Sequence, residues 1–295
     1  MAGQHVALLL LGIVLLCSFV CLVRGDTSGS VHRNCELSLR DSEGWFCQPD
    51  MIWSARKDIA LRQFARNDGY GLKDRYDDYF QANWEPELHC TFMERIGQVG
   101  DGGKWVCDPM RTASHSSPCL VYSIGSNNYF GFENELLKQL PHCEVHTFDH
   151  TSYPPQANDN QAIKFHKLGL SGKDAPPMAS LPTILASLNH TGKEITLFKI
   201  DIEGAEFELF TELFKSSPQV VRQLRQILIE VHFPNNPIAG STTKYGAIDT
   251  LMRNLHNAGF AIFSKEANFG AGGSCVEFSL IRLSHSFFPQ KSPTH

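Results

Sequence analysis

The feature that most constrains the fold of this chain is the alternation of short apolar runs with amphipathic segments between Cys119 and Leu283. Short apolar runs bounded by turn residues predict strands, and the segments between them, with apolar residues three or four apart, predict helices. Strands that alternate with helices form crossover units, which build a parallel sheet covered on both faces. We therefore expect an α/β fold with a doubly wound, mostly parallel, seven-stranded sheet.

The pattern assigns strands and helices to definite segments of this region. The expected strands cover residues 120–124, 145–148, 163–170, 195–202, 227–231, 261–263 and 276–283. The expected helices cover residues 132–140, 207–214 and 247–257, and Gly259 is in the position of a helix C-cap. We expect the last two strands to pair as an antiparallel hairpin across the glycine-rich loop 270–273.

The rest of the chain divides by composition. Val6–Val23 is apolar and uncharged, longer than the roughly 7–15 residues of a signal-peptide core and close to the roughly 20 of a membrane span. The next segment is rich in Ser, Gly and charge. An amphipathic helical stretch follows at 51–90, and a glycine turn at 100–103 precedes a short expected strand at 104–107. The predicted organisation is a signal peptide or signal anchor (1–25), a linker or stalk (26–50), a helical annex with the glycine turn (51–117), the main domain (118–285) and a tail (286–295).

The cysteines and a glycosylation triplet favour the secretory pathway. Seven cysteines follow the apolar run, which is many for a cytosolic enzyme, and Asn189-His190-Thr191 is an N-glycosylation acceptor. The basic residues after the run leave open an uncleaved anchor with the domain in the cytosol. If the segment is not cleaved, we expect it to be the chain's only contact with the membrane. Local disulfides Cys35–Cys47 and Cys90–Cys107 are plausible from spacing, whereas Cys119 and Cys143 fit buried free thiols equally well.

The charge balance bears on partners. The net charge is −5 and the sequence pI is near 6.2, so the chain has no basic field for non-specific nucleic-acid binding. We expect no nucleic-acid partner.

A candidate nucleoside site follows the first strand. Gly125 lets the chain turn sharply there, and Asp149 ends the second strand 24 residues later, near the spacing of an acid that binds ribose hydroxyls. An alternative for such a site is a nicotinamide-dependent oxidoreductase. The loop between the strand and the helix lacks the three glycines with which a helix N-terminus binds a pyrophosphate, and this absence disfavours NAD as the cofactor. The predicted cofactor-binding residues are Gly125, Ser126, Asn127, Glu133, Asp149 and Asp201.

A second group of polar residues follows two later strands. Asp201 and Glu203 end the strand 195–202, and Glu230 and His232 end the next one. Because the carboxyl ends of parallel strands meet at one edge, these residues can form one polar mouth. The predicted catalytic residues are Asp201, Glu230 and His232, with His232 either a general base or a core histidine bonded to backbone. A carboxylate–histidine metal site is the less favoured alternative, and we expect none.

Several motifs resemble a known family. The stretch Phe198-Lys199-Ile200-Asp201-Ile202-Glu203-Gly204-Ala205-Glu206 is similar to the signature of FkbM-type methyltransferases. The segments 100–107, 122–127 and 148–151 resemble a related eukaryotic methyltransferase-like group, and the similarity extends from about Cys90 to Leu283.

The resemblance implies a class I, Rossmann-like fold and S-adenosylmethionine as cofactor. It assigns Gly125 and Asp149 to the donor site and Asp201 and Glu203 to the rim of the active site. It also implies O-methylation of a hydroxyl on a glycan or a small molecule. The alternative is a catalytically inactive interaction domain, secreted or membrane-tethered, because a fold does not by itself imply activity.

Overall fold

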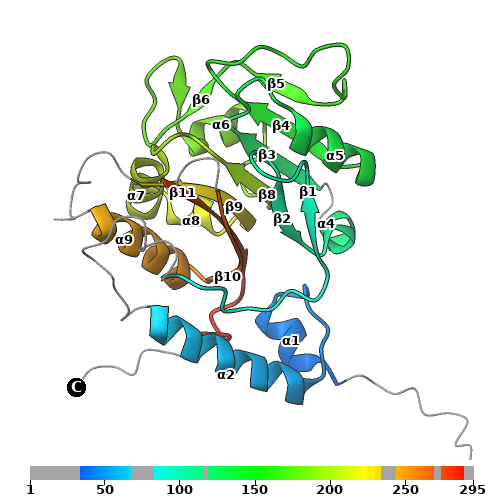
Figure 1. Ribbon diagram of the computed structural model, residues 1–295, viewed down its shortest axis with the longest axis vertical. Helices are drawn as coiled ribbons and strands as arrows, with labels where there is room; N and C mark the ends of the chain where they lie inside the picture. Colours follow the sequence, from blue (N-terminus) through cyan, green and yellow to red (C-terminus); the bar gives the residue numbers. More distant parts are fainter. Residues whose placement is uncertain (1–33, 68–82, 116–118, 234–243, 269–273, 289–295) are drawn as a thin grey trace, which may run out of the picture. The chain divides into compact units, whose positions relative to one another are not determined.

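The alternating region forms one seven-stranded sheet in the order β10-β11-β9-β8-β3-β4-β5 (Figure 1). The computed structural model describes residues 34–67, 83–115, 119–233, 244–268 and 274–288, which belong to one unit. The strands are β3 (Leu120–Ile124), β4 (Glu144–Phe148), β5 (Lys164–His166), β8 (Ile195–Ile200), β9 (Leu224–His232), β10 (Phe260–Ala267) and β11 (Cys275–Arg282).

The strand directions confirm the predicted doubly wound, mostly parallel sheet. Neighbouring strands from β9 through β8, β3 and β4 to β5 run parallel, and β11 lies antiparallel between β9 and β10. The chain passes outward from β3 to β5 and then returns to β8 on the other side of β3. This reversal opens a crevice at the carboxyl ends of β3 and β8, where ligands bind in open α/β sheets.

Helices cover both faces of the sheet, so its central strands are buried throughout. Along β3, Tyr122 and Ile124 belong to one apolar cluster, and Val121 belongs to a second on the opposite face. The first cluster includes residues of α6, α7, α8 and α9, and the second includes residues of α2 and α5. The bounds are α2 Asp50–Asn67, α5 Gly131–Gln139, α6 Leu181–Ser187, α7 Glu206–Ser216, α8 Pro218–Val221 and α9 Lys244–Asn257.

The predicted linker is wrong for residues 34–50, the part of it that the structure describes. Residues 34–50 contain a helix, α1 (Glu36–Asp41), and a disulfide between Cys35 and Cys47. Trp45 is 1% exposed and belongs to the second apolar cluster. Serine, glycine and charge dominate this segment's composition, but the two aromatic residues at 45 and 46 are buried, and they fix it on the domain.

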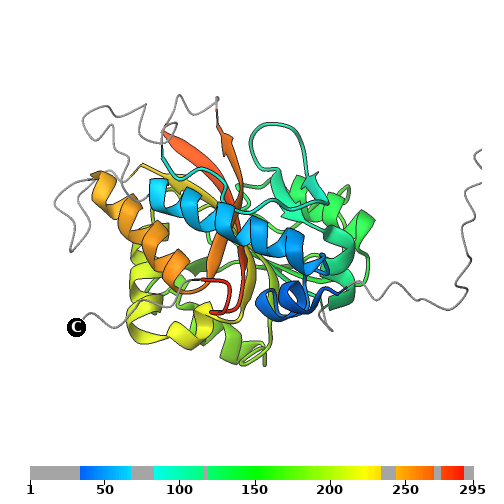
Figure 2. The same ribbon diagram turned by 90° about the horizontal axis from the view of Figure 1, so that it is seen from below.

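The helical annex is not a separate layer. Trp53 of α2 lies 5.6 Å, between ring centroids, from Phe287, and Phe64 stacks on His256 of α9. Figure 2 shows α2 crossing the unit alongside α9. The predicted boundaries near 118 and 285 are therefore wrong, because both flanking segments share the core; Phe287, which was assigned to the tail, is fully buried.

Other differences concern element lengths. The helix expected over 51–90 ends at Asn67, the next residues lie outside the described part, and Trp84 onward is irregular. The strand expected over 163–170 is divided into β5 and a short β6 (Gly169–Leu170), which pairs with β7 (Met178–Ala179). The strand expected over 104–107 is confirmed as β2 (Lys104–Cys107); it forms a hairpin with β1 (Met93–Ile96), which was not expected, and α4 (Pro109–His115) follows it.

Three disulfides join described segments. Cys35–Cys47 and Cys90–Cys107 are paired as the spacing suggested. Cys119 and Cys143, which spacing left open, also form a disulfide, because they precede the paired strands β3 and β4. Cys275 is the remaining free cysteine among the described residues.

The predicted signal segment lies outside the described residues. In the part of the chain that is described, no helix combines the length and the apolar character needed to cross a bilayer.

Candidate functional site

A cavity of ≈ 740 Å³ opens at the carboxyl ends of β3, β4, β8 and β9. This volume is within the range of small-molecule sites, about 300–1,000 Å³. The structure brings together nearly all of the predicted site residues around it. Those that line the cavity are Gly125, Ser126, Asn127, Asp149, Asp201, Glu203, Glu230 and His232.

The turn after β3 requires glycine at its first position. Gly125 has φ +83, and a Cβ atom there would lie 1.9 Å from the carbonyl oxygen of Asp201. Asn127 and Asn128 also have positive φ values, 47° and 62°, a conformation that asparagine tolerates better than most residues. These asparagines supply the turn that further glycines supply in glycine-rich donor loops.

Asp149 fastens this loop to the end of β4. Its Oδ2 accepts hydrogen bonds from the backbone N–H groups of Ser126 (2.9 Å) and Asn127 (3.0 Å). Its Oδ1 accepts from the backbone N–H and hydroxyl of Thr151 and the backbone N–H of Ser152. Burial alone would raise the pKa of Asp149, but these donors lower it well below its usual range. The observed role of this carboxylate is to hold the loop; the ribose contact stays a prediction.

Glu133 does not reach the cavity, so its assignment to the cofactor site is wrong. It lies in the first turn of α5, is 1% exposed and accepts a hydrogen bond from the hydroxyl of Ser123 within β3. The sequence could not show which side of the helix faces the sheet at this position, and the structure turns Glu133 inward.

The donor end of the cavity fits S-adenosylmethionine better than a dinucleotide. The loop N–H groups of Ser126 and Asn127 are already bonded to a carboxylate, so they are not available to a pyrophosphate. Apolar walls that an adenine ring requires are present at the ends of β3, β4 and β6. They are formed by Ile124, Phe148, Leu170 and Met178.

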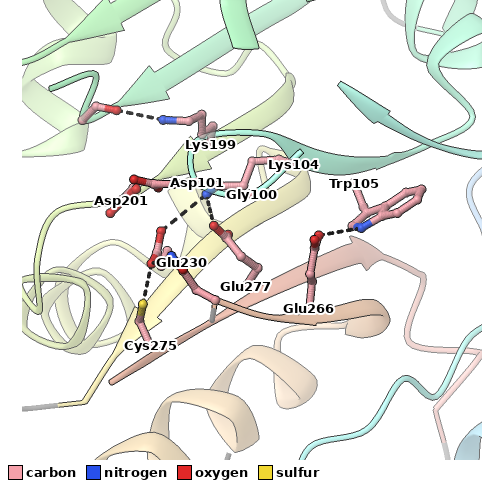
Figure 3. A network of polar contacts seen from close by, with 12 residues as sticks. Gly100, Asp101, Lys104, Trp105, Lys199, Asp201, Glu230, Glu266, Cys275 and Glu277 are labelled. Carbon is pink, nitrogen blue, oxygen red and sulfur yellow. Dashed lines mark hydrogen bonds and ion pairs between the residues drawn. The ribbon is translucent and has the colours of Figure 1, made fainter. Parts of the chain in front are cut away.

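Behind Glu230, at the opposite end of the cavity, lies a buried cation that the sequence analysis did not identify. Lys104 opens β2, is 2% exposed, and its ammonium lies between Glu277 of β11 and Glu230 of β9 (Figure 3). The Nζ atom lies 3.6 Å from Glu230 and forms a closer contact with Glu277. Although burial would lower the pKa of Lys104, these acids raise it, so the lysine is charged.

The two acids beside Lys104 differ in charge. Burial raises the pKa of Glu277 to about 8, so at neutral pH it accepts a hydrogen bond from Lys104 as a mostly protonated carboxyl. Burial acts in the same direction on Glu230, but the thiol of Cys275, 2.6 Å away, and the Lys104 ammonium hold the pKa of Glu230 below its ordinary value. Glu230 is therefore an anion paired with Lys104.

His232, for which the sequence left a general base and a core histidine open, is a cation in this structure. Its Nδ1 lies 3.2 Å from Glu206 Oε1, and its Nε2 lies 3.4 Å from Glu203 and 3.8 Å from Asp201. Burial would lower the pKa of His232, but the hydrogen bond to Glu206 and the surrounding carboxylates raise it to about 9. An imidazolium cannot accept a proton, so the role of general base passes to another residue.

Asp201 is the group suited to accept a proton. It follows β8, and its backbone N–H bonds to Ile124 at the end of β3, so its side chain lies at the switch point. Burial raises the pKa of Asp201, and the charges of Lys199 and Lys104 only partly offset this effect. A carboxylate with a raised pKa is ionised at neutral pH and is a better proton acceptor than an exposed aspartate.

Among the described residues, three groups of side chains at this cavity have ligand atoms within 4.8 Å of one another and could hold a cation: Asp101, Asp201 and Glu230; Asp201, Glu203 and His232; and Glu230, His232 and Cys275. Lys104 already supplies positive charge beside Glu230. The position of Lys104 depends on the β1–β2 hairpin, which is held over the sheet by a hydrogen bond from the Trp105 indole to Glu266 (2.8 Å; Figure 3). The glycine turn at 100–103 was the sequence signal for this hairpin, but the contact of Lys104 with Glu277 of β11 could not be predicted from it.

Comparisons with known proteins agree with this geometry. Residues 36–282 match the family model described as a methyltransferase domain. The chain is 25% identical over 159 residues to the probable methyltransferase-like protein 24 of Homo sapiens; the match covers 49% of this chain and 42% of that protein, less than half of the relative's length.

Two solved structures are similar at low scores. The fibrillarin pre-rRNA processing protein of Methanococcus jannaschii has a TM-score of 0.36 and 11% identity, over 55% of this chain and 66% of its own. An antibiotic-resistance methyltransferase, Kmr, has a TM-score of 0.33 and 13% identity, over 63% of this chain and 99% of its own.

Proposed function

Because the chain belongs to the methyltransferase-domain family that its residues 36–282 match, we propose that it methylates a hydroxyl group on a glycan or a small molecule. Membership confirms the methyltransferase resemblance of the strand motifs, and it implies S-adenosylmethionine as donor. That donor supplies a methyl carbon whose bond to sulfur breaks as an acceptor oxygen bonds to it. The protein then has to align the two molecules and remove one proton.

The observation that carries the proposal is one cavity that joins the Gly125 loop to Asp201. The loop and the apolar walls at Leu170 and Met178 would hold the donor. Asp201 lies at the edge where the two substrates would meet, because the Gly125 turn is packed directly against its backbone. In the proposed reaction the acceptor hydroxyl gives its proton to the carboxylate of Asp201.

The other charged residues support this role of Asp201. The His232 imidazolium, 3.8 Å away, favours the ionised form of Asp201 and is itself held by Glu206. Lys104 and Glu230 form a charge pair that keeps the wall of the cavity close to neutral. These residues orient and tune the base rather than take the proton.

The character of the cavity rim favours a hydroxyl-rich acceptor. Asp101 and Glu203 present carboxylate oxygens there, and such oxygens accept hydrogen bonds from sugar or alcohol hydroxyls. The same negative groups repel phosphate, and the chain's net charge is −5. Both facts argue against a nucleic-acid acceptor.

The test of donor binding is calorimetric titration of the full chain with S-adenosylmethionine, S-adenosylhomocysteine and NAD. We expect saturable binding of the first two and none of NAD. Gly125→Ala should abolish this binding, because a Cβ there meets Asp201. Gly192→Ala is the matched control: its φ is also positive, +78, but no atom lies within 4 Å of the added Cβ.

Equal binding by the two glycine variants, or no donor binding by a chain shown to be folded, would contradict the proposal. The second outcome would favour the interaction domain. Once donor binding is established, release of S-adenosylhomocysteine with neutral oligosaccharides and with phosphorylated acceptors distinguishes the two acceptor classes.

We propose further that the enzyme works in the secretory pathway. Three disulfides and an exposed Asn189 within a glycosylation triplet support this compartment. We expect the chain made in animal cells to lose apparent mass on treatment with a glycosidase that removes N-glycans. Asn189→Gln should migrate like the treated protein; an unshifted chain with free thiols would place it in the cytosol.

A further inference from the structure

A second polar cluster lies at the end of β4 that is remote from the cavity. Glu144 opens β4, His146 is two residues further along the strand, and His190 follows α6. One carboxylate oxygen of Glu144 and one ring nitrogen of each histidine lie within 4.8 Å of one another. None of the three lines the cavity, and the length of β4 separates Glu144 from Phe148 by roughly 13 Å.

The geometry points to a divalent transition-metal site formed by Glu144, His146 and His190, with zinc as the ion that fits best. Two imidazoles and a carboxylate are a known three-residue ligand set for zinc, with water in the fourth position. Ligand atoms at about 2.0–2.2 Å from a tetrahedral zinc lie about 3.3 Å apart. Side chains already within 4.8 Å reach that spacing by small rotations.

Both histidines are oriented by a second hydrogen bond, as metal-binding histidines are. The Nδ1 of His146 lies 2.9 Å from the Nε2 of His166 on the neighbouring strand β5. The Nδ1 of His190 lies 2.8 Å from the hydroxyl of Tyr122, a residue of β3 that is fully buried. These bonds at Nδ1 leave the Nε2 atoms of His146 and His190 for a metal ion.

The carboxylate and one imidazole of the cluster already lie at contact distance. The Nε2 of His146 lies 3.0 Å from the Glu144 carboxylate, so either a proton or a metal ion must lie between the two. Lys164, half-exposed on β5, pairs with Glu144 and competes with the ion for it.

The site is independent of the proposed function, and its test needs no methyl transfer. The full chain is treated with a chelator and titrated with Zn²⁺ in the calorimeter. We expect one ion per chain at this site, and His146→Gln or His190→Gln should weaken its binding by more than about 100-fold, beyond the effect of losing an outer partner. His142→Gln, an exposed histidine two residues before Glu144, is the matched control and should bind as the wild type does.

Three further variants separate this site from others. His232→Gln removes the histidine shared by two carboxylate clusters at the cavity and should leave this zinc ion in place. Tyr122→Phe should weaken binding about 10–100-fold through the orientation of His190. Lys164→Gln, on the surface, should strengthen it because the competing ammonium is gone.

Failure to bind Zn²⁺, or unchanged binding by folded His146→Gln and His190→Gln, would overturn the assignment. If circular dichroism shows that the buried-histidine variants do not fold, Lys164→Gln decides the question: an affinity no greater than that of the wild type would refute the site.

Discussion

His232 shows how neighbouring residues reverse the role that a residue type suggests. A free histidine is neutral at physiological pH and can accept a proton. Here Glu206 and two further carboxylates lie within 3.8 Å of its ring and raise its pKa to about 9. The pKa of Asp201 is also raised, by burial, but the consequence is the opposite: a carboxylate with a raised pKa is a better base.

These two residues predict the pH dependence of methyl transfer. Activity requires Asp201 ionised, so kcat/KM rises as pH passes its pKa, which lies above the ordinary aspartate range. Activity also requires His232 protonated, so it falls as pH passes about 9. Asp201→Asn should lower kcat about 10²–10⁴-fold with donor binding unchanged.

The matched control for Asp201→Asn is Glu203→Gln. The Glu203 side chain is 87% exposed at the rim, and its loss should leave the acid limb of the profile in place. A profile with no acid limb in the wild type, or an Asp201→Asn variant as active as Glu203→Gln, would exclude Asp201 as the base.

The β1–β2 hairpin is the element that completes the site. It carries Lys104 from outside the sheet to the carboxylates of β9 and β11, and a hydrogen bond from the Ser279 hydroxyl to the backbone of Trp105 (2.8 Å) fixes it there. The hairpin thus contributes one buried cation, Lys104, beside Glu230, while other strands form the cavity itself.

Lys104→Met tests the contribution of this hairpin. Removal of one partner of a buried charge pair costs about 3–5 kcal/mol of unfolding free energy. Because the Lys104 charge lowers the pKa of Asp201, the acid limb of the pH profile should move to higher pH. Lys138→Met, at a lysine with 76% side-chain exposure, should change neither quantity. An acid limb unmoved in a folded Lys104→Met protein would show that the hairpin does not act on the base.

On the scale of the whole molecule, the segments that flank the sheet are part of one unit. Arg225 of β9 forms ion pairs with Glu43 and Glu194, joining the turn after α1 to the sheet. The backbone N–H of Ser284 donates to the carbonyl of Asp41, which connects the C-terminal segment to α1. We therefore expect the sheet and its N-terminal segments to unfold together.

Trp45→Ala measures this cooperativity. Trp45 is 1% exposed, so its removal should lower the free energy of unfolding by about 3–5 kcal/mol in urea denaturation. Phe92→Ala, at a phenylalanine that is 70% exposed, should change it by less than about 0.5 kcal/mol. Equal stability of the two variants would show that residues 34–50 do not contribute to the core and would favour the predicted linker or stalk.

The amino-acid pattern was sufficient to predict the sheet and the edge at which the site lies. Apolar periodicity reports burial locally, so the strands around Val121, Leu197 and Leu228 were predictable, as was the meeting of Gly125 with Asp201 at the switch point. Both follow from short-range pattern and from the general geometry of parallel sheets.

Contacts between residues far apart in the chain could not be predicted in this way and are known from the fold. The pairing of Lys104 with Glu277, the inward direction of Glu133 and the burial of Trp45 depend on how separate elements pack. The charge of His232 depends on them too, since a pKa is set by the distances and burial of neighbouring groups, and neither can be derived from spacing along the sequence.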